Sequence, residues 1–231
     1  MSSSPVITAE PAPVPLASST RPATRVAAIG AAVFAVAFFL TVAVINVPHD
    51  ASDARLVHWW HEGVNLDSGL WSLGFAVVTA LAFAVVLNHL QSRLRPGDAG
   101  SAWAAFARST GGAFTTLLLV SAAVRGVFGH LVRLDGESLP GADVLRYSTA
   151  LNYTLMSSVV MGTCALTLLA LAHVERRTGI LPRWHAVVGY ACGAIMLAAS
   201  LVGYGQFTVP VAIVWGLSSA VAIWRTPVAV G

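Results

Sequence analysis

The sequence contains no lysine, only two cysteines and few charges of either sign. Charged residues make up 10% of the 231 residues, and all 13 basic residues are arginine. A soluble globular domain carries about 25% charged residues, so this composition excludes an ordinary soluble fold. Without lysine the chain has neither a Schiff-base nucleophile nor the phosphate-binding lysine of a P-loop. Cys164 and Cys192 lie inside apolar segments, which predicts buried packing residues rather than a disulfide or a metal knuckle.

Apolar residues dominate instead and make up 56% of the chain. They form runs long enough to cross a hydrocarbon core of about 30 Å, and the charges are gathered between those runs. This pattern predicts an all-α, polytopic membrane protein surrounded by lipids. The net charge of +3 does not indicate a nucleic-acid partner, because the arginines flank apolar runs instead of forming a patch on a folded domain.

The apolar runs predict six transmembrane helices, arranged as three hairpins in series. Their expected ranges are about 26–47, 68–90, 110–131, 148–171, 185–204 and 208–224, in a bundle that covers residues 25–226. Residues 1–24 are rich in Ser, Pro and Ala and are expected to form a disordered tail. A short tail, 227–231, follows the last helix.

Arginine is concentrated on one side of this predicted bundle. That side holds nine of the 13 arginines: Arg21, Arg25, Arg93, Arg95, Arg108, Arg176, Arg177, Arg183 and Arg225. The opposite side holds most of the acidic residues. Because cytoplasmic loops of membrane proteins are enriched in Lys and Arg, we expect both termini to lie in the cytoplasm.

One arginine, Arg125, falls inside the third predicted span. A charge at that depth needs a partner, water or a route to the membrane surface. Asn152 lies at matching depth on the fourth span with Tyr153 beside it, and we expect Arg125 to pair with Asn152. Two interpretations remain open: a polar ligand site between the third and fourth helices, or a structural arginine that reaches the surface with its long side chain.

The acidic loop before the second span contains the candidate metal ligands. Residues 50–63 have an amphipathic pattern, which predicts a short helix on the outer membrane surface, anchored by its paired tryptophans. His58, His61 and Glu62 in this segment are candidate ligands for zinc or copper. Their order matches neither of the metalloprotease patterns that contain these residue types, so a plain surface anchor is the alternative.

Histidines also occur at the ends of the predicted helices. His89 and His173 lie on the arginine-rich side, and His49 and His130 lie on the acidic side. Two such pairs suit the axial ligation of two haems, which would carry electrons across the membrane. The alternative is four interfacial histidines, because a haem at the edge of a span would not be enclosed. We therefore predict no cofactor, with haem and a divalent metal as the alternatives.

The fifth predicted helix contains a motif of small residues. Gly189 and Gly193 are separated by three residues, a spacing that lets two helix backbones approach closely. The motif predicts packing within the bundle or contact with a second membrane protein, including a second copy of this chain.

The last part of the chain resembles a known group of proteins. The segment Gly179–Trp184, a glycine-bearing helix, a short turn and a final helix that ends in Trp224-Arg225-Thr226-Pro227 are similar to the C-terminal third of uncharacterised actinobacterial six-helix integral membrane proteins. The resemblance covers about the last 55 residues and, more loosely, the six-helix layout. It implies a location in the bacterial plasma membrane and no particular site residues.

Three classes of function fit these observations. A structural or regulatory membrane component, our first expectation, needs only the packing glycines and the amphipathic segment. A small transporter or lipid-binding protein would use Arg125, Asn152 and the Ser and Thr residues of the fourth helix. A haem or quinone oxidoreductase would use the paired histidines. The sequence has no nucleotide-binding, nucleophile-elbow or HExxH motif, which favours a non-enzymatic protein.

Overall fold

A computed structural model describes residues 21–44, 47–48 and 51–226 of the chain. Within these residues the secondary structure is entirely helical, and six helices are long and apolar enough to cross a membrane. The predicted class, an all-α polytopic membrane protein with six spans, is therefore confirmed. The elements are α1 (Arg21–Ala43), α2 (Asp53–His61), α3 (Gly63–Ser92), α4 (Pro96–Ala99), α5 (Ala102–Arg133), α6 (Ala142–Thr154), the π-helix η1 (Leu155–Val160), α7 (Met161–Thr178), α8 (Arg183–Leu201), the 3-10 helix η2 (Gly205–Thr208) and α9 (Val209–Arg225).

The helix boundaries differ from the predicted ones mainly at the ends. The fourth span is continuous from Ala142 to Thr178, because α6, η1 and α7 follow one another without a break. The first helix begins at Arg21, so the prediction of a disordered tail was wrong for residues 21–24. Proline is tolerated in a first helical turn, which explains why Pro22 does not delay the start of α1. Residues 1–20 and 227–231, the rest of the two predicted tails, lie outside the described residues.

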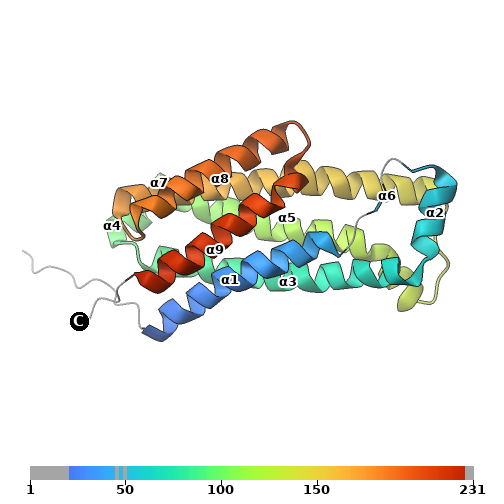
Figure 1. Cartoon of the computed structure of the whole chain (residues 1–231), viewed down its shortest axis with the longest axis horizontal. Coiled ribbons are helices and arrows are strands. Elements are labelled where there is room, and N and C mark those ends of the chain that lie inside the picture. Colours follow the sequence, from blue (N-terminus) through green and yellow to red (C-terminus); the bar gives the residue numbers. More distant parts are fainter. Residues whose placement is uncertain (1–20, 45–46, 49–50, 227–231) are drawn as a thin grey trace, which may run out of the picture.

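The six spans form a closed ring (Figure 1). Going around it, α1 packs against α3, α3 against α5, α5 against α7, α7 against α8, α8 against α9, and α9 against α1. Each pair of consecutive spans is in contact, which is the predicted arrangement of three hairpins. The first and last spans close the ring. Because the chain crosses the bundle six times, both ends of the described chain lie at the same end (Figure 1).

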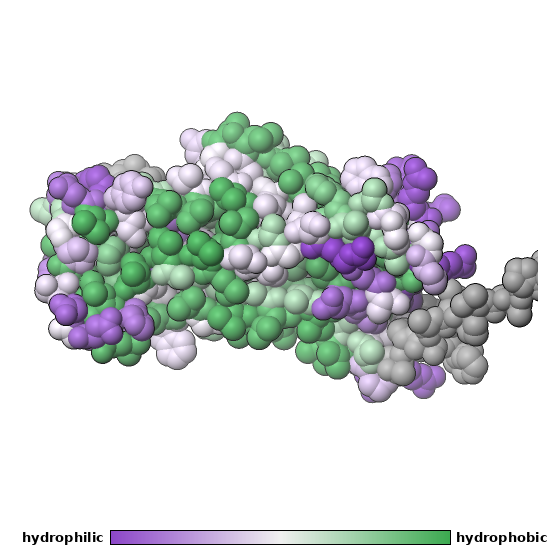
Figure 2. Space-filling model, turned by 180° about the vertical axis from the view of Figure 1, so that it is seen from behind, coloured by the Kyte–Doolittle hydropathy of each residue, from purple (hydrophilic) through white to green (hydrophobic). Residues whose placement is uncertain are grey.

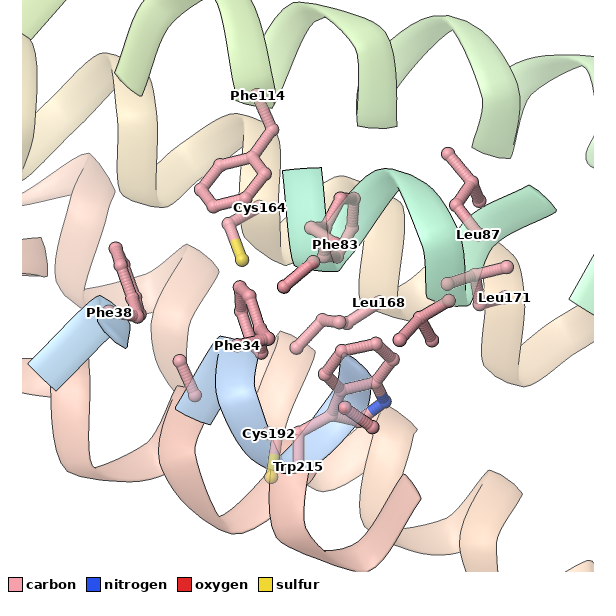
Figure 3. Close-up of a cluster of buried hydrophobic side chains, with 14 of the residues drawn as sticks. Phe34, Phe38, Phe83, Leu87, Phe114, Cys164, Leu168, Leu171, Cys192 and Trp215 are labelled. Atoms are coloured by element: carbon pink, nitrogen blue, oxygen red, sulfur yellow. The ribbon is translucent and has the colours of Figure 1, made fainter. Parts of the chain in front are cut away.

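Aromatic side chains fill the centre of this ring (Figure 3). Phe34 of α1 lies 5.3 Å from Phe83 of α3 and 5.9 Å from Trp215 of α9, measured between ring centroids. Phe114 of α5 packs edge-on against Phe83 at 4.9 Å. Such tilted and edge-on contacts are the arrangements that aromatic rings prefer.

The two cysteines belong to the same core. Cys164 and Cys192 are buried and free, as predicted from their apolar surroundings.

Close backbone contacts hold neighbouring helices together. A Cβ atom placed on Gly129 of α5 would lie 2.5 Å from the carbonyl oxygen of Leu66 in α3. On α8, a Cβ atom on Gly193 would lie 2.7 Å from the side chain of Leu169 in α7. The small-residue motif of α8 therefore serves packing inside the chain, one of its two predicted roles.

The two ends of the bundle differ in charge and in shape. We call the end that contains α4 and the turn between α7 and α8 the arginine-rich end, and the end that contains α2 the acidic end. α8 is about 28 Å long and α5 about 48 Å at 1.5 Å per residue, and the surplus length of α3, α5 and α6 projects beyond the tips of α8 and α9 at the acidic end (Figure 1). An apolar belt separates the two polar ends (Figure 2).

The outer helix α2 packs against protein. Its Trp60 is only 2% exposed and lies 5.0 Å from Phe128 of α5, and its Leu56 is buried in the same small cluster. Asp53 of α2 also forms an ion pair with Arg146 of α6. The predicted helix exists, but the expectation that its apolar face anchors it in lipid was wrong, because α3, α5 and α6 extend far enough to cover that face.

Candidate functional site

A cavity of about 450 Å³ opens near the acidic end, where α2, α6, η1 and the turn between α8 and η2 meet. We call it the outer pocket. Its polar lining comes mainly from the fourth span: Thr149, Tyr153, Thr154, Ser157 and Ser158, with Gln206 of η2 opposite. Because the 19-residue helix α8 ends beside it, and about 20 residues cross the hydrocarbon core, the outer pocket lies near the membrane boundary.

The π-helix η1 forms one wall of the outer pocket. A π-helix has a wider turn than an α-helix and often occurs at functional sites. Here the turn after α8 lies directly on it: a Cβ atom on Gly205 would lie 1.9 Å from the carbonyl oxygen of Ser157. Only glycine allows this approach, so Gly205 positions Gln206 over the pocket.

The hydroxyl groups at η1 have no partner within the described residues. Other hydroxyls of the spans bond to their own helix, as Thr163 and Thr167 do to carbonyl oxygens one turn earlier, or to a neighbouring helix, as Ser72 and Ser121 do. Thr154, Ser157 and Ser158 make no such bond, and Ser157 is 4% exposed. Thr154 is exposed and Ser158 is partly exposed, and the hydroxyl oxygen of Ser157 is open to the pocket. These hydroxyls therefore offer hydrogen bonds to an occupant of the outer pocket.

The charges around the outer pocket are already neutralised. Arg146 on its rim pairs with Asp53 and donates to the carbonyl oxygen of Ala51 at 3.1 Å. Tyr153 donates its hydroxyl to the carbonyl oxygen of Val47 at 3.1 Å. The pocket thus presents neutral polar groups.

Arg125 lies behind this wall and bonds in another direction. It is 7% exposed and donates to the carbonyl oxygen of Thr41 in α1 at 2.6 Å and to Ser72 of α3 at 3.1 Å. Asn152 instead accepts a hydrogen bond from Ser121 of α5, at 3.1 Å. The predicted pairing of Arg125 with Asn152 was wrong. Ser121 lies one turn before Arg125 on the same face of α5 and bonds to Asn152, while the longer side chain of Arg125 reaches α1 and α3. Of the three predicted ligand-binding residues, only Tyr153 lines the outer pocket.

Near the arginine-rich end, three helices share a buried polar network that the sequence analysis did not identify. His185 of α8 contacts Glu175 of α7 through Nδ1 at 2.8 Å and Ser219 of α9 through Nε2 at 2.9 Å. All three side chains are buried. The sequence does contain a signal for the contact between Glu175 and His185. The two residues lie five positions before and five positions after Ile180, in a short hairpin turn.

Hydrogen-bond geometry gives the proton count of this network. Ser219 donates its hydroxyl to the carbonyl oxygen of Trp215 at 2.8 Å, so its oxygen accepts from Nε2 of His185. Because Nε2 carries a proton, the short contact between Nδ1 and Glu175 requires one more shared proton. The His185–Glu175 pair is therefore neutral in sum. The order Ser-His-Glu resembles a hydrolase triad, but this serine hydroxyl is buried and already donated to its own helix.

Glu175 has a second oxygen that faces away from His185. Its Oε1 has no partner within the described residues, and neither does Nε2 of Gln91 in α3. Both residues line one small cavity. The two atoms are an unpartnered acceptor and an unpartnered donor.

The described candidate metal and haem ligands have neighbours of several kinds. His58 lies 3.7 Å from Glu62 on exposed side chains, and the described residues contain no group of three metal-binding side chains. His173 stacks on Trp103 with ring centroids 4.5 Å apart and contacts the hydroxyl of Tyr190 at 3.3 Å. Of the other haem candidates, His89 is buried, His130 lies 3.8 Å from Asp135 at the acidic end, and His49 lies outside the described residues.

Comparison with known proteins finds no matching family model, no curated protein of similar sequence and no solved structure of similar fold.

Proposed function

We propose that this multi-pass membrane protein binds a small, uncharged, hydrogen-bonding molecule in the outer pocket. The observation that carries the proposal is the set of unpartnered hydroxyls of Thr154, Ser157 and Ser158 on the wall of a cavity of about 450 Å³. That volume falls within the range of roughly 300–1,000 Å³ that ligand pockets occupy.

The lining favours an amphipathic ligand. Arg146 already has an acidic partner, so a charged ligand would have to break that ion pair. Hydroxyls and the amide of Gln206 suit a molecule with hydroxyl or carbonyl groups. Tyr204 and Phe207, exposed beside the opening, suit its apolar part. The ligand class is therefore a neutral alcohol or carbonyl compound that partitions into the membrane boundary.

Binding fits this architecture better than transport. The aromatic cluster around Phe34, Phe114 and Trp215 fills the ring between the outer pocket and the other end of the bundle. A ligand held at the tips of α8 and α9 suits a receptor or regulatory component. On the distribution of arginine we propose that both termini lie in the cytoplasm. On the resemblance of the last 55 residues we propose a bacterial plasma membrane as the location.

Cysteine accessibility tests whether the outer pocket is open. Ser157→Cys and Ser158→Cys, each made after Cys164 and Cys192 are replaced by alanine, should react with a neutral methanethiosulfonate reagent. Thr167→Cys is the control, because Thr167 is buried on the same span outside the pocket and bonds to Thr163. If the two pocket cysteines react no faster than the control, the pocket is closed and the proposal fails.

Mass spectrometry of copurified small molecules tests the ligand. A neutral molecule retained by the wild-type protein should be lost, by about tenfold or more, from Ser158→Leu, which fills the pocket. Thr163→Leu, on the same span but not in the lining, should retain it. Equal retention by both variants, or no retained molecule together with unreactive cysteines, would leave the protein as a structural membrane component.

A further inference from the structure

A second hollow, of about 460 Å³, lies at the arginine-rich end between the end of α7 and the start of α8. We call it the inner groove. Its lining consists of Arg176 from α7 and Arg183, Ala186, Val187 and Tyr190 from α8. Two arginines therefore stand at its mouth, and apolar or aromatic side chains follow along α8.

The two arginines of the inner groove carry unneutralised charge. Within the described residues neither Arg176 nor Arg183 makes a hydrogen bond or an ion pair, and both are exposed. The acid nearest in sequence, Glu175, is buried and occupied by His185. At the acidic end, by contrast, Arg133 and Arg146 each form an ion pair with an aspartate.

The surface below these arginines is apolar and faces outward. Val187 belongs to a membrane-spanning helix and is 67% exposed. Tyr190 directs its hydroxyl to His173, which leaves the ring as the wall of the groove. Trp184, half exposed in the first turn of α8, is a residue typical of the membrane boundary. A charged mouth above an apolar surface at the level of the lipid headgroups matches the two parts of a phospholipid.

We propose that the inner groove binds an anionic phospholipid, with the phosphate between Arg176 and Arg183 and an acyl chain along Val187 and Tyr190. Basic pockets between spanning helices are known to take lipid headgroups, and arginine provides paired donors for phosphate oxygens. This site is independent of the outer pocket, because it lies at the other end of the bundle and selects a charged ligand.

Thermal unfolding of the purified protein in detergent tests the site. Added phosphatidylglycerol should raise the unfolding temperature of the wild type by several degrees, and phosphatidylcholine should not. Arg176→Gln with Arg183→Gln should lose most of that rise. The matched control is Arg21→Gln with Arg25→Gln, which removes the same charge from the same end without touching the groove and should keep the rise.

Native mass spectrometry gives a second readout that does not depend on stability. The wild type and the control should carry bound phosphatidylglycerol, and the groove variant should carry at least tenfold less. An equal loss in the control pair would show a general attraction of charge and overturn the site. Stabilisation by inorganic phosphate alone, at equal phosphate concentration, would overturn the lipid as occupant and assign the groove to free phosphate.

Discussion

Glu175 and His185 show how a buried polar pair fits inside a membrane protein. Each side chain alone would be costly in this position. Together they share one proton, are neutral in sum and are joined to Ser219 on a third helix. The network therefore fixes α7, α8 and α9 relative to one another without leaving a net charge in the protein interior.

This arrangement predicts that the double variant is more stable than either single one. Glu175→Leu or His185→Leu alone leaves its partner buried without a counterpart and should lower the free energy of unfolding by about 3–5 kcal/mol, whereas replacing both buried partners with apolar residues is often close to neutral. Thermal or detergent-induced unfolding of the three variants checks this. A double variant whose loss equals the sum of the single losses would show that the two side chains do not depend on each other.

The individual contacts were the least predictable part of the structure. Hydropathy gives the depth of Arg125 in the membrane but not the direction of its side chain. That side chain donates to Ser72, while Ser121, one turn earlier on the same face, bonds to Asn152. In the sequence, Glu175 is one more charged residue at a helix end. Its burial could not be predicted there, because it depends on α8 folding back over it. Ser219 is one of several small residues in α9, and nothing near it in the sequence marks it.

The close packing of helix pairs in this bundle depends on the positions of glycine, where a helix has no side chain. α3 and α5 touch backbone to backbone at Gly129, while Gly112 of the same helix has no atom within 4 Å of the place where a Cβ would stand. The two glycines are therefore equivalent in helix propensity and opposite in packing.

Alanine at these two positions should have effects of opposite sign. Gly129→Ala forces α3 and α5 apart and should cost about 1–3 kcal/mol of stability, the usual range for overpacking. Gly112→Ala should be neutral or stabilise by up to about 1 kcal/mol, because alanine is the better helix former. Unfolding curves of the two variants, compared with wild type, measure both effects. If Gly129→Ala is as stable as Gly112→Ala, the close contact at Leu66 does not hold the pair together.

The spans themselves were predictable because each one must be apolar over a length set by the lipid. The π-helix η1 was not, since it depends on the docking of the turn at Gly205 against Ser157. The packing of α2 was missed for a related reason. Its tryptophans suit lipid and protein equally, and the choice depends on how far α3, α5 and α6 project beyond the belt.

The whole molecule is polarised between its two ends. The arginine-rich end contains unpaired cations, such as those of the inner groove, and the acidic end contains arginines bound to aspartates. The positive-inside rule uses the number of basic residues on each side, and nine of the 13 arginines lie on the side of the arginine-rich end.

Single cysteines at the two ends should report that orientation. In a chain without Cys164 and Cys192, Ser138→Cys at the acidic end should react with an impermeant thiol reagent on intact cells. Asp98→Cys and Thr178→Cys, at the arginine-rich end, should react only after the cells are permeabilised. Reaction of Thr178→Cys without reaction of Ser138→Cys would reverse the orientation and place the outer pocket toward the cytoplasm.

The shared proton of Glu175 and His185 also bears on how the chain enters the membrane during synthesis. When α7 leaves the ribosome, its glutamate has no partner until the ten residues up to His185 have followed. A translocon that released α7 alone would leave Glu175 without the partner that neutralises it inside the folded bundle. We therefore expect α7 and α8 to be inserted as one hairpin, and α7 to wait at the protein-conducting channel until the histidine arrives.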